Sequence, residues 1–290
     1  MYHVDRDAPI LFAMAPSTYE RELDAARRLA LAAGKLVMSY VNTNKITIEK
    51  KADDSPVTSA DREASELILE GLSQAFPGDV LISEEGPDNL ARRERGARVW
   101  FIDPIDGTRD FIRGQSGFSV MIGLVVDRKP RLGVVYQPSG DRLYLAAPGF
   151  PPCMVELGCA RPLRCSQTYR LEEVRLVASK SHRTAKIDEV KQALGIVDEF
   201  NIGSVGLKLG LIALAERDLY VNPSSKSKAW DTCAPEAILV AAGGEMSDLY
   251  GSPLVYDGPE LYNSRGLVAS NGILHAAVLN RLRPLFQNSK

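Results

Sequence analysis

The stretch FIDPIDGTRDFI, residues 101–112, places two aspartates three positions apart, directly after the apolar run ARVWFI. Asp103 and Asp106 are separated by Pro104 and Ile105, and a Gly-Thr pair follows them. A segment of this composition is most often a solvated turn. Here the apolar run predicts a buried strand that ends at Asp103, so a metal site at the end of the strand is the alternative.

The proline within this stretch has a physical role if the segment is a metal site. Pro104 fixes its own φ, removes one N–H group and restricts Asp103 to extended backbone. We expect the chain to bend there, so that the Ile105 carbonyl points to the same side as the two carboxylates. Gly107 then permits close approach of the backbone, and a helix beginning there would offer free N–H groups to an anion.

Three further acidic positions lie at the ends of predicted elements. Glu84, followed by Glu85, ends a predicted strand, while Asp61 and Asp231 each open a predicted helix. Singly, each is typical of an ordinary charged loop or an N-cap. Ends of buried elements commonly converge on one edge of a layered α/β fold, so these three positions, together with Asp103 and Asp106, indicate one site.

The ligand types in this set indicate which ion the site would bind. Carboxylate and carbonyl oxygens without His or Cys favour Mg²⁺ or Mn²⁺ over zinc. Mg²⁺ usually keeps several waters and is completed by phosphate oxygens of a substrate. The pattern therefore favours phosphoryl chemistry, in which metal ions hold the attacking and leaving oxygens.

The rest of the chain predicts alternating helices and strands. Residues 17–41 form a helical pattern with a capping box of Ser17 and Glu20, and residues 118–147 read as a strand meander with turns at 129–130 and 139–140. The second half alternates strands with helices, which predicts layered α/β. We expect an N-terminal extension over 1–16, an α+β lobe over 17–165, and an α/β lobe over 166–290 that together form one catalytic unit.

Composition excludes several classes of function. The 290 residues carry a net charge of −2, which argues against nucleic acid as the main partner. No apolar run approaches the roughly 20 residues of a membrane span, and the N-terminus lacks the features of a signal peptide. Four cysteines without a CxxC pair predict reduced thiols in a cytoplasmic protein. We expect residues 1–16 to be a loose extension, or the natural start to be Met14.

Three motifs carry a resemblance to a known family. SEEG (83–86), DPIDGTRDF (103–111) and WDTCAPEAILVAAGG (230–244) resemble the inositol monophosphatase superfamily of Mg²⁺-dependent, lithium-sensitive phosphatases. The resemblance covers roughly residues 17–284. It implies a layered α-β-α-β-α sandwich of the inositol monophosphatase and fructose-1,6-bisphosphatase type.

The resemblance also implies roles for individual residues. Two or three Mg²⁺ ions, with Mn²⁺ as a substitute, would be held by Glu84, Asp103, the Ile105 carbonyl, Asp106 and Asp231. Thr108 would lie between Asp61 and the attacking water, so that this pair would accept its proton.

Two finer motifs resemble one branch of the superfamily. KADDSPVTSAD (51–61) and WDTCAPEAIL (230–239) are similar to 3'(2'),5'-bisphosphate nucleotidases of sulfur metabolism, which convert 3'-phosphoadenosine 5'-phosphate (PAP) to AMP. PAPS, which would give APS, is a second candidate substrate. A phosphorylated nucleotide would then be the small-molecule partner, and the implied substrate contacts are Gly107, Thr108, Ser179, His182, Ser204, Lys208 and Asp231.

Two alternatives stay open at this point. An inositol monophosphatase or a related sugar phosphatase would use the same metal chemistry. A non-catalytic binding protein on the same fold is the other, although such a protein would be expected to have lost a ligand carboxylate.

Overall fold

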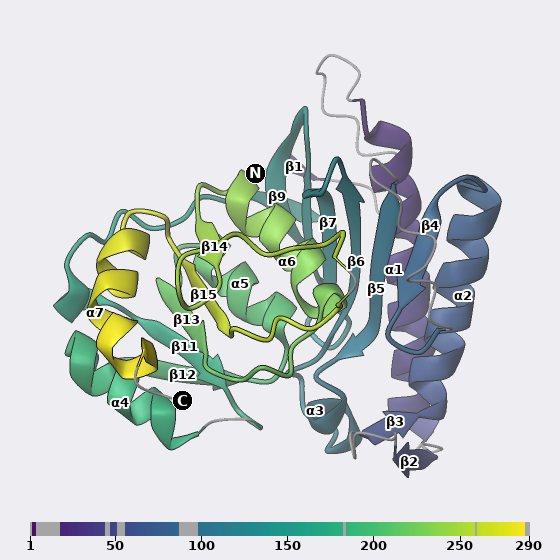
Figure 1. Ribbon diagram of the computed structural model, residues 1–290. Helices are drawn as coiled ribbons and strands as arrows, with labels where there is room; N and C mark the ends of the chain where they lie inside the picture. Colours follow the sequence, from purple (N-terminus) through teal and green to yellow (C-terminus); the bar gives the residue numbers. More distant parts are fainter. Residues whose placement is uncertain are drawn as a thin grey trace.

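The computed structural model describes residues 2–3, 18–43, 47–50, 56–86, 98–181, 184–258 and 260–287. Five layers, helix–sheet–helix–sheet–helix, follow one another across the molecule (Figure 1). The outer layers are α1 (Glu20–Thr43) with α2 (Ser59–Ala75), and α4 (Ala185–Leu194) with α7 (His275–Gln287). Between the sheets lie α5 (Val205–Ala213) and α6 (Ala229–Ala241). The predicted α-β-α-β-α class is confirmed.

The first sheet has the strand order β1-β10-β9-β8-β7-β6-β5-β4. Only β4 and β5 run parallel; every other neighbouring pair in this sheet is antiparallel. The strands are β1 (Tyr2–His3), β4 (Val80–Ser83), β5 (Val99–Asp106), β6 (Ser119–Val126), β7 (Lys129–Gln137), β8 (Arg142–Ala147), β9 (Phe150–Glu156) and β10 (Cys159–Pro162).

The second sheet has the order β12-β11-β13-β15-β14. Its strands are β11 (Leu176–Ser179), β12 (Glu199–Ile202), β13 (Leu219–Asn222), β14 (Glu245–Ser247) and β15 (Leu267–Ser270). The remaining short elements are the β2–β3 pair (Ile48–Lys50 and Pro56–Thr58), α3 (Thr108–Ile112) and the 3₁₀ turn η2 (Leu171–Glu173).

Residues 101–112 differ from the sequence-based prediction in one respect. The strand does not end at Asp103 but continues as β5 through Asp106. Asp103 pairs with Met121 and Asp106 with Ser119, so β5 carries one more residue than β6 over this interval. Pro104 lies in this bulge, where a missing N–H costs no ladder hydrogen bond.

Other differences lie at turns and edges. The turn between β6 and β7 is made by Asp127 and Arg128, both at positive φ, rather than by residues 129–130. Strands β9 and β10 were not predicted. The N-terminal extension contributes β1, which pairs with β10. Ser17, the predicted cap of α1, lies outside the described residues.

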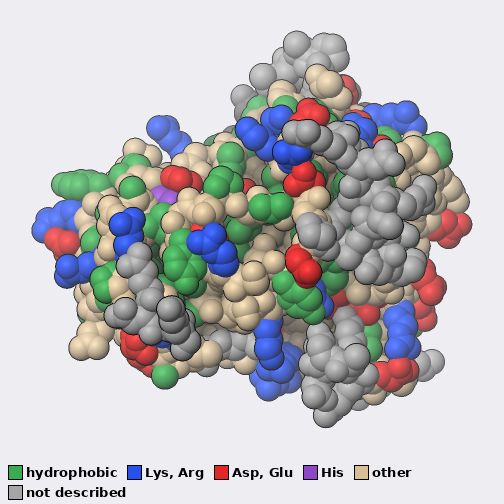
Figure 2. Space-filling view, viewed as in Figure 1, with side chains coloured by type: hydrophobic (Ala, Val, Ile, Leu, Met, Phe, Trp, Pro, Cys, Tyr) green, Lys and Arg blue, Asp and Glu red, His purple; other side chains and the backbone are tan. Residues whose placement is uncertain are grey.

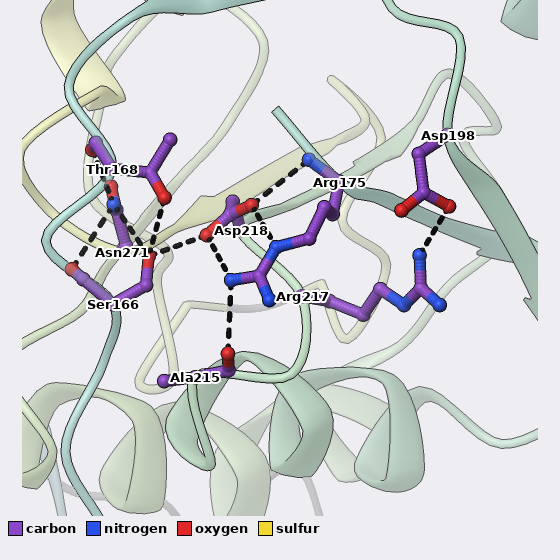
Figure 3. Close-up of polar contacts among 8 residues, drawn as sticks. All are labelled: Ser166, Thr168, Arg175, Asp198, Ala215, Arg217, Asp218 and Asn271. Atoms are coloured by element: carbon purple, nitrogen blue, oxygen red, sulfur yellow. Dashed lines mark hydrogen bonds and ion pairs between the residues drawn. The ribbon is translucent and has the colours of Figure 1, made fainter. Parts of the chain in front are cut away.

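A buried polar cluster fixes the segment through which the chain passes from the first sheet to the second (Figure 3). Asp218, fully buried, accepts hydrogen bonds from the Arg175 guanidinium at 2.8 and 2.9 Å and from the Ser166 hydroxyl. Asn271 donates to the Ser166 carbonyl at 3.2 Å. The paired charges and satisfied donors give this crossing a defined course.

Charged side chains of both signs lie on the surface (Figure 2). On the face shown in Figure 2, Lys and Arg side chains are interspersed with Asp and Glu. None of the described helices combines the length and the apolar composition that crossing a bilayer requires.

Helix α6 approaches the first sheet unusually closely because two strand positions lack a side chain. A Cβ atom on Gly133 would lie 2.1 Å from the Ala234 carbonyl oxygen, and one on Gly123 would lie 2.7 Å from the Ala234 nitrogen. These glycines allow the backbone of α6 to rest on β6 and β7. The depth of α6 in turn fixes where its N-terminal residue Asp231 lies.

We expect Gly133→Ala to destabilise the protein, because the new methyl group would collide with the α6 backbone, which cannot move without displacing the helix. Overpacking of this kind costs about 1–3 kcal/mol. The free energy of unfolding from chemical denaturation measures the effect. Gly78→Ala is the control, since a Cβ there meets no atom within 4 Å; equal losses in both variants would contradict the packing argument.

One acidic side chain of α6, Glu236, is half-buried and has no basic partner among the described residues. Glu236 accepts a hydrogen bond from the Tyr256 hydroxyl, whose oxygen also lies 3.1 Å from Thr232 Oγ1. Burial raises the pKa of Glu236 to about 7, and the Tyr256 hydrogen bond opposes this shift. The folded protein therefore retains this proton at pH values where the unfolded chain has released it.

This proton makes stability depend on pH. Between the ordinary pKa of 4.5 and about 7, only the folded state holds the proton, so rising pH lowers the free energy of unfolding. Glu236→Gln should reduce the loss of stability between pH 5 and pH 8 by an amount on the order of 2–3 kcal/mol. Denaturation curves at the two pH values test this. The exposed Glu66→Gln should leave the pH dependence unchanged.

Candidate active site

A pocket of about 230 Å³ opens where several element ends meet. It lies at the carboxyl ends of β5, β11 and β13 and at the amino ends of α3 and α6. Its walls are formed by Pro56, Glu84, Asp103, Ile105, Asp106, Gly107, Thr108, Arg109, Ser179, Ser181, Gly203, Val205, Lys208, Tyr220, Asn222, Ser224, Lys226, Ser227 and Asp231.

All five residues expected to hold metal ions line this pocket: Glu84, Asp103, Ile105, Asp106 and Asp231. The parallel pairing of β4 with β5 brings the first two together, because Ser83 is the register partner of Ile102 and the Glu84 N–H donates to the Ile102 carbonyl at 3.0 Å. Sequence reasoning therefore located the convergence of element ends.

The pocket concentrates negative charge. Burial, followed by repulsion from Glu84, Asp106 and Asp231, holds the pKa of Asp103 well above its ordinary range. Burial and the charges of Glu84 and Asp106 likewise hold the pKa of Asp231 well above its usual value. A bound cation would stabilise carboxylates gathered in this way. None of the described residues that line the pocket is His or Cys, so its ligands would be oxygen atoms. This donor set fits Mg²⁺ or Mn²⁺.

The carboxylates share the pocket without enclosing one point. Among the described residues, no group of three or more His, Cys, Asp or Glu side chains is arranged to hold a metal ion. Instead, Asp103 accepts a hydrogen bond from the Ile105 N–H at 3.1 Å through Oδ1. A carboxylate has two oxygens, so a bond that orients the group leaves a second oxygen for a ligand.

Asp61 and Asp231 are oriented by the same local hydrogen-bond pattern at the start of a helix. Each is the third residue of its helix and accepts a hydrogen bond from the backbone N–H of the residue before the helix. Thr58 N donates to Asp61 Oδ2 at 2.8 Å, and Lys228 N donates to Asp231 Oδ2 at 2.7 Å. Both aspartates thus lie at position N3 of a helix, not at the N-cap.

Asp61 lies behind the pocket wall. It is 2% exposed and does not line the cavity, and Thr58 Oγ1 donates to its Oδ2 at 2.6 Å. Burial raises the pKa of Asp61 to about 7, while both Thr58 hydrogen bonds oppose the shift. Glu85 and Glu84 raise this pKa further, which shows that Asp61 is near the acidic group.

Thr108 lines the pocket, but its partner differs from the one expected. Its hydroxyl donates to the Ile105 carbonyl at 3.1 Å. In the part of the chain that the structure describes, no hydrogen bond joins Thr108 to Asp61. A hydrogen bond between Thr108 and Asp61 would therefore require the Thr108 hydroxyl to rotate and break its hydrogen bond to the Ile105 carbonyl.

Ser204 lies below the pocket rather than on its surface. It is fully buried, donates to Asp106 Oδ2 at 2.6 Å and accepts from the Leu207 N–H at 3.0 Å as the N-cap of α5. Gly206 N donates to the same Asp106 oxygen at 3.0 Å. The structure thus places Ser204 where it orients Asp106, not where it would contact a substrate directly.

Lys208 is a buried cation at the floor of the pocket. It is 1% exposed, its Nζ donates to the Gly203 carbonyl at 2.5 Å, and it lies over the Tyr220 ring at 5.2 Å. Burial lowers the pKa of Lys208 to about 8, and the charges of Asp106, Asp110 and Asp231 oppose the shift. As expected from its apolar neighbours in the sequence, this ammonium is held near negative charge.

Of the remaining predicted substrate contacts, some line the pocket and one lies outside the described residues. Gly107 and Ser179 line the pocket, whereas His182 lies outside the described residues. Sequence reasoning missed Arg109, Ser181, Asn222 and Ser224, which also line it. Arg109 follows Thr108 directly and Ser181 lies two residues after Ser179, so adjacency to matched positions was the available signal.

Comparison with known proteins agrees with this geometry. The model of the inositol monophosphatase family matches residues 19–287. The 3'(2'),5'-bisphosphate nucleotidase CysQ of Escherichia coli K12 is 36% identical over 249 residues, covering 86% of this chain and 99% of the relative. A histidinol-phosphatase of Chlorobaculum parvum is 33% identical over 263 residues, covering 89% of this chain and 97% of the relative.

A solved structure gives the same result. CysQ from Bacteroides thetaiotaomicron, described as a bacterial member of the inositol monophosphatase family, superposes with a TM-score of 0.73 at 29% identity. The match covers 87% of this chain and 98% of that one. With a family match over nearly the whole chain and the acidic motifs meeting in one pocket, the chain belongs to the inositol monophosphatase family.

Proposed function

We propose that this protein is a Mg²⁺-dependent 3'(2'),5'-bisphosphate nucleotidase that hydrolyses the 3'-phosphate of PAP to give AMP and phosphate. The observation that carries the proposal is a single pocket walled by four carboxylates and also lined by three cationic side chains, Arg109, Lys208 and Lys226. The nucleotidase relatives over most of the chain support the branch. PAPS is proposed as a second substrate.

The acidic wall would hold the metal ions. Glu84, Asp103, Asp106 and Asp231 would supply carboxylate oxygens and Ile105 a carbonyl, with two or three Mg²⁺ ions or Mn²⁺ in their place. Dependence on metal ions, typically Mg²⁺, is general in this family. Bound there, the ions supply positive charge to the phosphoryl group as it is transferred.

The protein's own groups would handle the attacking water. We assign Asp61 and Thr108 to orient it and to accept its proton. Asp61 Oδ2 is bound by Thr58, so Oδ1 is the oxygen that would face the water. The Thr108 hydroxyl, now on the Ile105 carbonyl, is free to rotate toward a new acceptor.

The substrate would be held by other residues of the same pocket. Ser179 and Lys208 line the pocket, and with His182 they are proposed to contact the nucleotide. The cavity of about 230 Å³ is smaller than the ~300–1,000 Å³ typical of pockets for whole ligands. The phosphorylated part of a nucleotide would therefore occupy it, with the base lying at the mouth.

A substrate panel tests the function. Phosphate release from PAP, PAPS, inositol 1-phosphate, fructose 1,6-bisphosphate and histidinol phosphate should be measured in parallel with Mg²⁺. We expect kcat/KM for PAP to exceed that for inositol 1-phosphate by about 100-fold or more, because two charge-assisted contacts to a second phosphate are each worth about 1.5–3 kcal/mol. A preference for inositol 1-phosphate would instead support the inositol phosphatase alternative. No turnover of any substrate would favour a binding protein.

Asp103→Asn should separate activity from stability. We expect kcat to fall by at least ~100-fold, since even groups that only support metal ligands are worth 10–100-fold. In the presence of a chelator at pH 8, the variant should unfold at a higher temperature than the wild type, because one repelling charge has been removed.

Thermal unfolding with and without Mg²⁺ provides the second half of this test. The wild type should gain more stability from Mg²⁺ than Asp103→Asn does, because the variant lacks one ligand. The exposed Asp188→Asn serves as the control and should behave as the wild type in both assays. Near wild-type turnover by Asp103→Asn would contradict the assignment of this carboxylate.

A further inference from the structure

Two cationic side chains line the pocket without a role in the scheme above. Arg109 is the second residue of α3, directly after Thr108, and Lys226 lies in the loop between β13 and α6. Both are exposed, in contrast to Lys208, which is buried at the floor. The pocket therefore carries one cation at its floor and two on side chains that reach solvent at its mouth.

Neither cation is neutralised by the residues that the structure describes. Arg109 has no ion pair with any of them, and its hydrogen bond is one from Nη1 to the Ser181 carbonyl at 3.3 Å. Lys226 likewise pairs with no carboxylate in the described ranges. A guanidinium has five N–H donors, so most of those on Arg109 remain available to an anion.

The bond of Arg109 gives the guanidinium a defined place. It links the start of α3, which follows the metal-ligand strand, to the segment after β11, 72 residues further along the chain. The same two segments are joined again by the Lys180 ammonium, which donates to Gln115 Oε1 at 2.8 Å. Arg109 is thereby held across the pocket mouth rather than turned away from it.

Ser181 adds a second polar group at this point. It lines the pocket, and its hydroxyl oxygen is buried with no hydrogen-bond partner among the described residues. A buried hydroxyl without a partner is unfavourable. Rotation about a single side-chain bond would let it donate to an anion bound by Arg109.

We infer that Arg109 and Lys226, assisted by the Ser181 hydroxyl, bind the second phosphate of a bisphosphorylated substrate from the mouth of the pocket and so select bisphosphates over monophosphates. This inference rests on the proposed function. Phosphate carries up to two negative charges and accepts several hydrogen bonds, and an Arg side chain can bind it through two N–H groups at once. Inositol 1-phosphate offers no such second group.

Kinetics on a matched pair of substrates test the inference. PAP and adenosine 3'-phosphate differ only in the 5'-phosphate. Arg109→Gln and Lys226→Gln should each raise KM for PAP by about 10-fold or more, the effect of losing roughly 1.4 kcal/mol of binding, and change KM for adenosine 3'-phosphate by less than about twofold. Arg109→Lys should recover part of the loss, because it keeps the charge but not the paired donors.

Arg113→Gln is the matched control, since Arg113 is an exposed arginine one turn further along that does not line the pocket. It should affect neither substrate. Equal losses on both substrates in Arg109→Gln would overturn the inference, because Arg109 would then act on the cleaved phosphate or on the fold.

Calorimetry separates this inference from the proposed function. PAP and adenosine 3'-phosphate are titrated into Asp103→Asn protein with and without Arg109→Gln. Tighter binding of PAP that depends on Arg109 would support the inference even if the wild type failed to hydrolyse PAP, a result that would count against the proposed function alone. Equal affinities for the two nucleotides with Arg109 present would overturn the inference.

Discussion

Repulsion among the carboxylates that share one pocket is the constraint on which the rest of this site depends. Glu84, Asp103, Asp106 and Asp231 line one pocket, and their mutual repulsion adds to the cost of burying them. Such an arrangement would disperse if the side chains were free to turn. The fold prevents this by attaching each acid to the end of a rigid element and by giving Asp103, Asp106 and Asp231 a hydrogen bond from the backbone.

The position of helix α6 is fixed by close packing of its backbone against the first sheet. Gly123 and Gly133 lack the side chains that would hold α6 away from the first sheet, and the helix rests on the strands at backbone distance. Asp231 is therefore placed by contacts made by Ala234, about one turn further along the same helix. On the other side, the parallel register of β4 and β5 and the bulge at Pro104 fix the remaining acids. The clustered acids thus destabilise the folded protein at the pocket, and the packing of helices and sheets around them compensates for this cost.

The part of the site that could be predicted from the sequence is the part encoded by local pattern. Asp61, Glu84, Asp106 and Asp231 each lie at or next to the end of an element, and convergence of such ends is a general property of layered α/β folds. Contacts that join distant segments were not predictable in this way. Ser204 reads as a substrate contact in its motif, yet it turns toward Asp106, 98 residues earlier in the chain. Thr108 similarly binds Ile105 rather than Asp61, because the bulge in β5 presents that carbonyl.

The distribution of charge across the pocket connects the metal chemistry to substrate choice. Cations bound by the acidic wall would attract any phosphate, so that wall cannot distinguish a monophosphate from a bisphosphate. Discrimination requires positive charge at a distance from the reacting phosphorus, where a second phosphate alone can reach it. Lys208 is poorly suited to this, because its ammonium is buried beside Asp106 and bound to the Gly203 carbonyl. Arg109 has unused donors at the mouth, and it directly follows Thr108, the residue proposed to orient the attacking water.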